Sequence, residues 1–496
     1  MEVTNNQENR PHFLRLGRDT FFYGSMNLVA KVVSLALLPL YTRFFTPAEY
    51  GIMELLLTVS ALLTRLLSAG VDSALLRFYN EYEAQERRRL VFSGLLYMTA
   101  VGIPFGLFLT GFSGSLSVLL FGSSDHSALV ALMFVTIPFI MIGWIPQDLT
   151  RLEFKKRSYN FLMTGGNVFY AIAVLILLLL FHKGLWGVMF SHFLKATLFA
   201  LLGIILVRRN LFPKIDLAAL KKLLTFGAPL LPAAIALWVS NSSDRFFLLR
   251  LASLDSVGVY SVANRLAWVQ WFVFSSFQLA FTPIAYSIYK KPETVSLFRR
   301  VFLYYIAFSS LLGIGISTFS LNLLHLLTPE AYHPAHQVVG VLSLSVILHG
   351  AFYIFGIGIS IAKRTKYFAY SYLTGAAVNI GLNLLMIPRY GAMGAAIATV
   401  ISFATVALLG AHWSRRFYPL KLPFGRLILI CVLFLTFNTI GIFIDTHLGG
   451  SLSVKVCALS AFAFLMFRLL DKEERALLVR LGARLVGARV KGFPWK

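Results

Sequence analysis

The stretch GRDTFFYGSMNLVAKVVSLALLPLYTRFFTPAEYGIMELLLTVSALLTRLLSAGVDSALLRFYNE (17–81) contains two long apolar runs, residues 19–43 and 51–79. Each run exceeds the roughly 20 apolar residues that a helix needs to cross a bilayer. Each also carries charged side chains, although a charge at bilayer depth costs at least ~2.5–3.5 kcal/mol on insertion scales. The stretch therefore predicts two membrane-spanning helices whose polar faces line a water-filled cavity.

Similar apolar runs continue along the 496-residue chain. Apolar residues make up 58% of it and charged residues 13%, whereas about a quarter of the residues in a water-soluble domain are charged. We therefore predict an all-α polytopic membrane protein with about 14 transmembrane helices. The predicted spans are 19–43, 51–79, 91–111, 127–149, 159–181, 185–207, 223–249, 257–288, 296–320, 335–362, 367–387, 391–411, 427–444 and 452–470.

The basic residues give the orientation. Of the 45 Lys and Arg residues, 33 fall in eight segments on one side of these spans and only four on the other. Short cytoplasmic loops carry such an excess, so both termini are predicted to be cytoplasmic. The first 18 residues are polar, which argues against a cleavable signal peptide. The net charge of +24, given its distribution, should attract anionic membrane lipids. We expect no nucleic-acid partner.

The spans divide into two halves of six. TGGNVFYAIAVL (164–175) and TGAAVNIGLNLL (374–385) open similar helix pairs in the two halves, which indicates a duplication with a binding site between the repeats. The predicted parts are a cytoplasmic N-terminal arm (1–18), an N-lobe (19–207), a cytoplasmic linker (208–222), a C-lobe (223–411), two further spans (412–470) and a basic amphipathic cytoplasmic tail (471–496).

Polar residues share helix faces in the first two spans. Asn27 and Lys31 lie four residues apart in the first span. Glu54, Arg65 and Asp72 fall on one stripe of the second. We predict that Asn27, Lys31 and Arg65 line a cavity, and that the two acids serve ion coupling or pairing. Because the central charges are mainly basic, the cavity should accept an anionic guest.

The eighth span carries a polar and aromatic stripe. Asn264, Trp268, Trp271 and Gln278 lie along it, with Arg265 beside them. A cation beside this stripe favours an anionic guest. All five residues are predicted to line the cavity.

Other intramembrane polar residues allow two interpretations. Lys195 either lines the cavity or pairs with an acid. Asp244 either serves ion coupling or pairs with Arg245. Asn379 and Asn383 either contribute to function or hold helices together.

Motifs for nucleotide and metal chemistry are absent from the sequence. It contains no G-x-x-x-x-G-K-[ST] phosphate loop and no H-E-x-x-H zinc motif. Cys431 and Cys457 lie within late spans and are expected to pack there. We expect no cofactor apart from possible H⁺ or Na⁺ coupling.

Three motifs indicate a family. They are YTRFFTPAEYG (41–51), GVDSALLRFY (70–79) and GVYSVANR (258–265). With the arrangement of six, six and two spans, the chain resembles the Wzx-type polysaccharide flippases of the multidrug/oligosaccharidyl-lipid/polysaccharide exporter (MOP) superfamily. The resemblance covers essentially the whole chain but does not specify a substrate.

The resemblance implies two six-helix lobes facing a central cationic cavity, plus two C-terminal helices. It implies a flippase, not an enzyme, that moves an undecaprenyl-diphosphate-linked oligosaccharide across a bacterial or archaeal cytoplasmic (inner) membrane by alternating access. The product would enter lipopolysaccharide or exopolysaccharide biosynthesis, with a polymerase or export machinery as a further partner. Lys31, Arg65 and Arg265 would meet the diphosphate, while Trp268 and Trp271 would stack on sugars.

Three alternatives remain from the sequence. The nearest is a lipid II flippase of the same superfamily. A drug or cation exporter fits less well, because it would favour acidic cavity residues. A membrane glycosyltransferase or polymerase fits least, because such an enzyme usually needs a larger extramembrane loop.

Overall fold

The chain folds into helices that cross a membrane many times. The computed structural model describes residues 33, 35–290, 294–419, 423–471 and 474–475, and every regular element within them is helical. Eleven described helical segments are long and apolar enough to span a bilayer. The prediction of an all-α polytopic membrane protein is therefore confirmed, with 14 spans as an approximate number.

The first bundle follows the N-terminal half of the sequence. Its elements are α4 (Pro47–Ser68), α5 (Val71–Phe78), η1 (Tyr79–Glu81), α6 (Ala84–Thr110), α7 (Ser113–Phe121), α8 (Ser127–Leu152), α9 (Lys156–Asn160), η2 (Phe161–Gly165), α10 (Gly166–Leu175), η3 (Ile176–Leu180), α11 (Gly184–Val207) and η4 (Arg208–Asn210). The short α3 (Leu38–Phe44) precedes them and contacts α4 of this bundle and α18 of the second. Most of the predicted span 19–43 lies outside the described residues.

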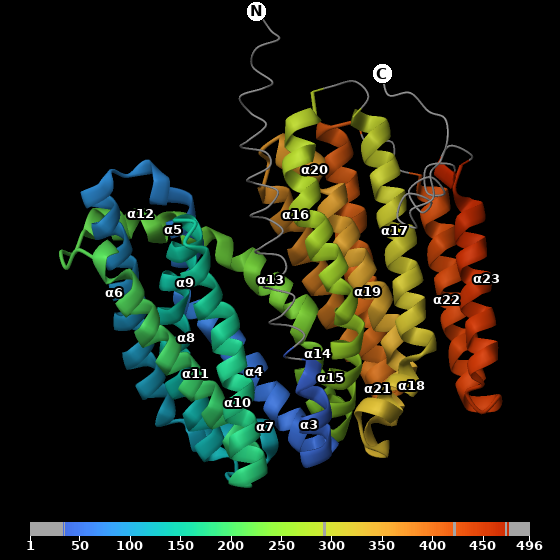
Figure 1. Ribbon diagram of the computed structural model, residues 1–496, viewed down its shortest axis with the longest axis horizontal. Coiled ribbons are helices and arrows are strands. Elements are labelled where there is room, and N and C mark those ends of the chain that lie inside the picture. Colours follow the sequence, from blue (N-terminus) through green and yellow to red (C-terminus); the bar gives the residue numbers. More distant parts are fainter. Residues whose placement is uncertain (1–32, 34, 291–293, 420–422, 472–473, 476–496) are drawn as a thin grey trace, which may run out of the picture.

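The second bundle contains most of the predicted C-lobe. Its elements are α13 (Leu231–Ser242), α14 (Asp244–Leu251), α15 (Leu254–Ala267), η6 (Trp268–Gln270), α16 (Trp271–Ile288), α17 (Thr294–Thr318), α18 (Ser320–Leu327), η7 (Glu330–Ala335), α19 (His336–Phe355), α20 (Ile357–Ile361) and α21 (Lys366–Phe417). Two more helices, α22 (Phe424–His447) and α23 (Leu452–Leu469), lie at its outer side (Figure 1).

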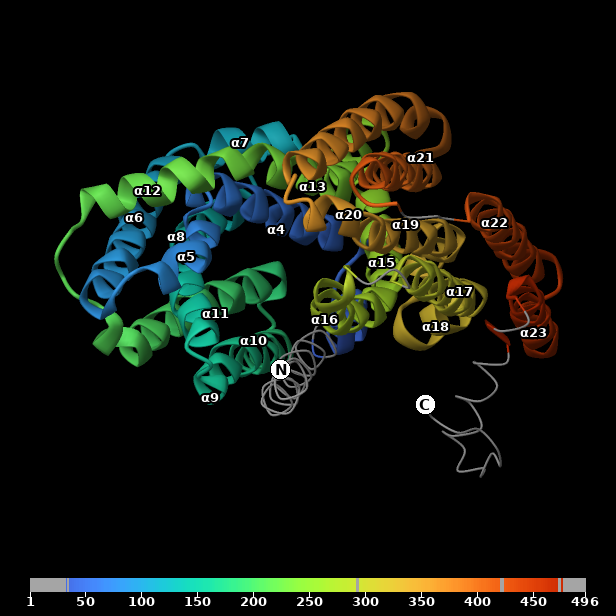
Figure 2. The ribbon, with the colours of Figure 1, turned by 90° about the horizontal axis from the view of Figure 1, so that it is seen from above.

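Within the described residues, the two bundles approach each other at one end. In Figure 1, α3 and α15 lie beside α4, which both contact, in the lower part of the view, whereas α12 (Leu217–Gly227) and α20 are far apart at the upper end. A bent connection of α12, η5 (Ala228–Leu230) and α13 crosses from the first bundle to the second, as Figure 2 also shows. The loop charges predict that the upper end is cytoplasmic.

Local sequence explains one helix break within a predicted span and one between two predicted spans. Helix α4 begins with a capping box, in which Thr46 and Glu49 bond each other's backbone, and Pro47 occupies the first turn. It ends at Ala69 and Gly70, which both have a left-handed conformation. In α21, Gly391 has φ 52° and ψ −129° and separates two predicted spans, 367–387 and 391–411.

Each bundle has its own apolar core. Residues of α5, α6 and α8 form one buried cluster, and residues of α17, α19 and α21 form another. A third cluster joins α3 and α4 to α14, α15 and α19. This shared cluster fixes the lower end of the bundles and surrounds the candidate site.

Candidate functional site

The backbones of α4 and α15 approach closely between the lobes. A Cβ atom added to Gly51 would lie 2.6 Å from the Leu254 carbonyl oxygen, and one on Gly258 would overlap the Pro47 carbonyl. Only glycine allows this approach. Two hydrogen bonds cross the same boundary, from Thr42 Oγ1 to the Leu327 carbonyl (3.3 Å) and from the Tyr332 hydroxyl to the Phe45 carbonyl (2.8 Å).

An ion-pair cluster joins the lobes just inside this contact. Arg265 of α15 donates to Glu54 of α4 over 2.7 Å, and Arg245 of α14 lies 3.6 Å from the same carboxylate. The Arg265 guanidinium also lies 5.4 Å from the ring of Tyr50 and 5.8 Å from that of Tyr41. Glu54 is only 10% exposed. A buried carboxylate in this position needs its cations, so the cluster holds the lobes together.

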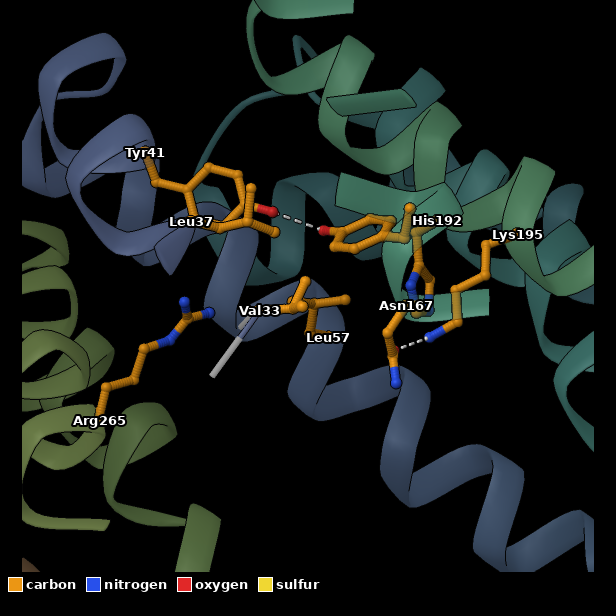
Figure 3. A pocket seen from close by; sticks show the side chains of 9 residues that line it. Val33, Leu37, Tyr41, Leu57, Asn167, His192, Lys195 and Arg265 are labelled. Atoms are coloured by element: carbon orange, nitrogen blue, oxygen red, sulfur yellow. Dashed lines mark hydrogen bonds between the residues drawn. The ribbon is translucent and has the colours of Figure 1, made fainter. Parts of the chain in front are cut away.

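A cavity of about 180 Å³ borders this cluster (Figure 3). Arg265 lies on its second-lobe side, while Lys195 donates to Asn167 Oδ1 over 2.7 Å on the other side. The described residues that line the cavity include no carboxylate, and one nitrogen of Arg265, Nη1, has no hydrogen-bond partner. The lining residues are Val33, Leu37, Tyr41, Leu57, Asn167, Tyr170, His192, Lys195 and Arg265.

Lys195 thus lines the cavity, with an amide as its bonded partner. Its ammonium lies 5.7 Å from the ring of Tyr170, whose hydroxyl bonds that of Tyr41 over 2.8 Å. Sequence reasoning missed Asn167 and His192. Two features of the sequence point to them. His192 lies one turn before Lys195 on α11, and Asn167 belongs to the duplicated TGGN segment.

A second polar cluster lies within the C-lobe around Asp244. The carboxylate accepts hydrogen bonds from Tyr260 (2.5 Å), Thr399 (2.7 Å) and Asn383 (2.8 Å), and is 1% exposed. Asn379 Oδ1 accepts from Asn383, while Asn383 Oδ1 and Asn379 Nδ2 have no partner. The three groups that donate hydrogen bonds to the carboxylate are neutral, and no ion pair within 4.0 Å joins it to Arg245, although Arg245 still interacts with Asp244 electrostatically.

Arg65 lies away from the cavity. Eleven residues separate it from Glu54, or about 16 Å along α4. It donates to Asp72 over 2.8 Å, and its guanidinium lies 4.6 Å from the Trp144 ring. The structure therefore does not bring Arg65 and Arg265 into this one cavity. The physical reason is this distance along α4, while the helix break at Ala69 and Gly70 turns Asp72 back toward Arg65.

The remaining candidates of the eighth span occupy a different position. Trp271 stacks on His349 (4.8 Å between centroids) and contacts Trp268 (5.0 Å), so both rings are part of a half-buried aromatic group in the C-lobe. Asn264 and Gln278 are half-buried. None of these four lines the 180 Å³ cavity.

The two candidates of the first span, Asn27 and Lys31, lie outside the described residues.

Sequence comparison identifies the family of the chain. Residues 16–289, more than half of the chain, match the family described as Polysaccharide biosynthesis protein. Over 233 residues the chain is 30% identical to the succinoglycan biosynthesis transport protein ExoT of Rhizobium meliloti, an alignment that covers 46% of this chain and 45% of ExoT. The chain thus spans about half the length of this relative.

Solved structures show the same fold at low sequence identity. The lipid II flippase MurJ in an inward closed conformation matches with a TM-score of 0.72 and 14% identity, over 90% of this chain and 99% of MurJ. An inward-facing multidrug resistance MATE family transporter of the MOP superfamily matches with a TM-score of 0.62 and 14% identity, over 79% and 94%. This chain therefore belongs to the Polysaccharide biosynthesis protein family and has the fold of the MOP superfamily transporters.

Proposed function

We propose that this protein is a flippase that moves a lipid-linked oligosaccharide diphosphate, with undecaprenol as the lipid, across the cytoplasmic membrane for surface or exopolysaccharide synthesis. The observation that carries the proposal is the cavity between the lobes, which presents Arg265 and Lys195 without a carboxylate among its described lining residues. Paired cations suit a diphosphate. The described lining residues would offer a cationic drug no opposite charge.

Arg265 would serve both the substrate and the contact between the lobes. Its bond to Glu54 holds the lower end closed, and its Nη1, which has no hydrogen-bond partner, would donate to the bound diphosphate. A diphosphate bound to Arg265 would compete with Glu54 for the guanidinium. Binding would thus weaken the interlobe ion pair and favour separation of the lobes at that end, which is alternating access driven by differential affinity.

The size of the cavity agrees with a need for such movement. Its volume of about 180 Å³ lies below the ~300–1,000 Å³ of ordinary small-molecule sites. An oligosaccharide therefore requires the lobes to move apart. The lipid chain would remain in the bilayer, beside the protein.

We further propose that the Asp244 cluster binds the coupling ion, Na⁺ or H⁺. A buried carboxylate without a bonded cation is costly, and a bound ion would relieve that cost. Asp244, Asn379, Asn383 and Thr399 would supply oxygen ligands for Na⁺ if the Asn383 amide turned its unpartnered Oδ1 inward. Protonation of Asp244 would serve H⁺ coupling.

The excess of Lys and Arg on one side predicts that residues 80–90, 208–222 and 412–426 lie in the cytoplasm. Single cysteines in these loops should resist a membrane-impermeant reagent added to intact cells, whereas cysteines in 112–126 should react. Efficient labelling of residues 208–222 from outside would contradict the predicted orientation. Anionic lipids and a polysaccharide polymerase or export machinery are the expected partners.

Transport in vesicles tests the function directly. Purified protein should move a fluorescent undecaprenyl-diphosphate oligosaccharide between leaflets without changing it chemically, in the presence of a Na⁺ or H⁺ gradient. Transport of lipid II alone would favour the peptidoglycan alternative. Chemical lengthening of the sugar would indicate a transferase, and efflux of a cationic dye alone would indicate a drug exporter.

A further inference from the structure

An apolar groove runs along the outer side of the C-lobe and shares no lining residue with the interlobe cavity. It has a volume of about 290 Å³ and lies between α17, α19, α21 and α22. We call it the α21–α22 groove; it includes Phe302, Ala351, Ala404, Leu408, Phe424 and Leu435. Leu408 and Leu435 are 58% and 44% exposed, so the groove opens sideways where lipid chains would contact it.

The length of the groove matches one leaflet. From Phe424 to Leu435 it follows eleven residues of α22, or about 16 Å, roughly half of the ~30 Å hydrocarbon core. Phe424 is the first residue of α22, and the loop charges predict that this end is cytoplasmic. The groove therefore corresponds to the cytoplasmic leaflet.

A cation lies at its cytoplasmic mouth. The guanidinium of Arg415, near the end of α21, lies 5.6 Å from the ring of Phe424, which lines the groove. Arg415 is exposed, and no described carboxylate forms an ion pair with it. In contrast, Arg426 is bound to Asp471 (2.5 Å) and Glu474 (3.4 Å).

From this arrangement we propose that the α21–α22 groove binds an anionic phospholipid of the cytoplasmic leaflet, with one acyl chain in the groove and the phosphate at Arg415. The apolar lining, one-leaflet length and cationic mouth match the chain, the depth and the headgroup of such a lipid. A partner membrane helix would need a groove across both leaflets. The groove shares no lining residue with the interlobe cavity, which argues against the lipid chain of the substrate.

Native mass spectrometry of the purified protein tests the proposal. Detergent micelles would contain either phosphatidylglycerol or phosphatidylcholine with the same acyl chains. The protein should retain one phosphatidylglycerol in preference to phosphatidylcholine. Arg415→Gln should lower that retention about fivefold, the effect of one basic residue at a membrane surface.

Arg416→Gln is the matched control. Arg416 carries the same charge one residue further along α21, but its guanidinium lies over Trp413 (4.9 Å) and not over a groove residue. Its loss should leave lipid retention unchanged. Ala404→Trp, which places a large ring in the groove from a half-buried position, should lower retention of both lipids; the melting temperature of each variant reports its folding.

The native Cys431 supplies a second measurement, since it lines the groove, whereas Cys457 does not. In a Cys457→Ala protein, phosphatidylglycerol should slow alkylation of Cys431, and Ala404→Trp should remove this protection. Equal retention of the two lipids, or equal effects of Arg415→Gln and Arg416→Gln, would overturn the proposal. Displacement of phosphatidylglycerol by undecaprenyl phosphate at equal concentration would assign the groove to the carrier lipid instead.

Discussion

Two regions of α4 carry ion pairs of similar composition but different surroundings. Near its start, Glu54 bonds Arg265 of the other lobe, and the carboxylate is 10% exposed. Near its end, Arg65, which is 44% exposed, bonds Asp72 of its own lobe, whose side chain is 11% exposed. The loss of a partner costs most where both charges are largely buried and less where one of them reaches solvent. The comparison teaches that the same stripe of charges can join lobes at one end and only fix a helix turn at the other.

The largest effect is expected for Arg265→Gln. It removes the cation nearest the proposed diphosphate and leaves Glu54 with the more distant Arg245. Transport in vesicles should fall more than tenfold, and the free energy of unfolding should fall by about 3–5 kcal/mol. Arg77→Gln, which removes an exposed charge paired with Glu81, is the control. Normal transport by folded Arg265→Gln would remove Arg265 from the site.

The double variant Glu54→Gln/Arg265→Gln separates the two roles of Arg265. Without the carboxylate, the loss of the guanidinium no longer leaves Glu54 short of a cation, although the buried Arg245 loses its ion pair with Glu54. Stability should therefore recover in part from the Arg265→Gln loss, as measured by thermal or denaturant unfolding. Transport should remain low because the phosphate ligand is still absent. Recovery of transport together with stability would show that Arg265 acts through packing alone.

Asp244→Asn tests whether the buried charges divide into a substrate group and a coupling group. The substitution keeps the shape of the side chain but removes the charge that would attract Na⁺ or carry H⁺. Transport driven by an ion gradient should fall about tenfold. Binding of the diphosphate substrate should change less than twofold, as measured by fluorescence in detergent. An unaltered dependence on both ion gradients in the variant would exclude Asp244 as the coupling residue.

The smallest effect is expected for Arg65→Ala. Because the Arg65 side chain is 44% exposed, solvent screens its pair with Asp72, so the melting temperature should fall much less than in Arg265→Gln and transport should fall less than threefold. Arg65→Lys and Asp72→Asn should be milder still. If Arg65→Ala instead abolishes transport in a folded protein while Arg65→Lys keeps part of it, Arg65 contacts the diphosphate in another conformation.

The membrane architecture was largely predictable from sequence because its causes are local. Apolar length defines a span, and the excess of Lys and Arg on one side predicts orientation, without knowledge of which helices are neighbours. The unusual charges were also visible, since Glu54, Lys195, Asp244 and Arg265 stand out in apolar surroundings. Their identity as candidates therefore came from the sequence.

The partners of these charges were decided by the tertiary structure. Glu54 and Arg265 are 211 residues apart in sequence, and their contact depends on how two lobes dock through Gly51 and Gly258. Helical periodicity likewise placed Asp72 on one continuous stripe with Glu54, but the left-handed turn at Ala69 and Gly70 ended the helix between them. A sequence pattern reports the face of one helix; which charge meets which depends on the packing of separate helices, and that packing only exists in the folded chain.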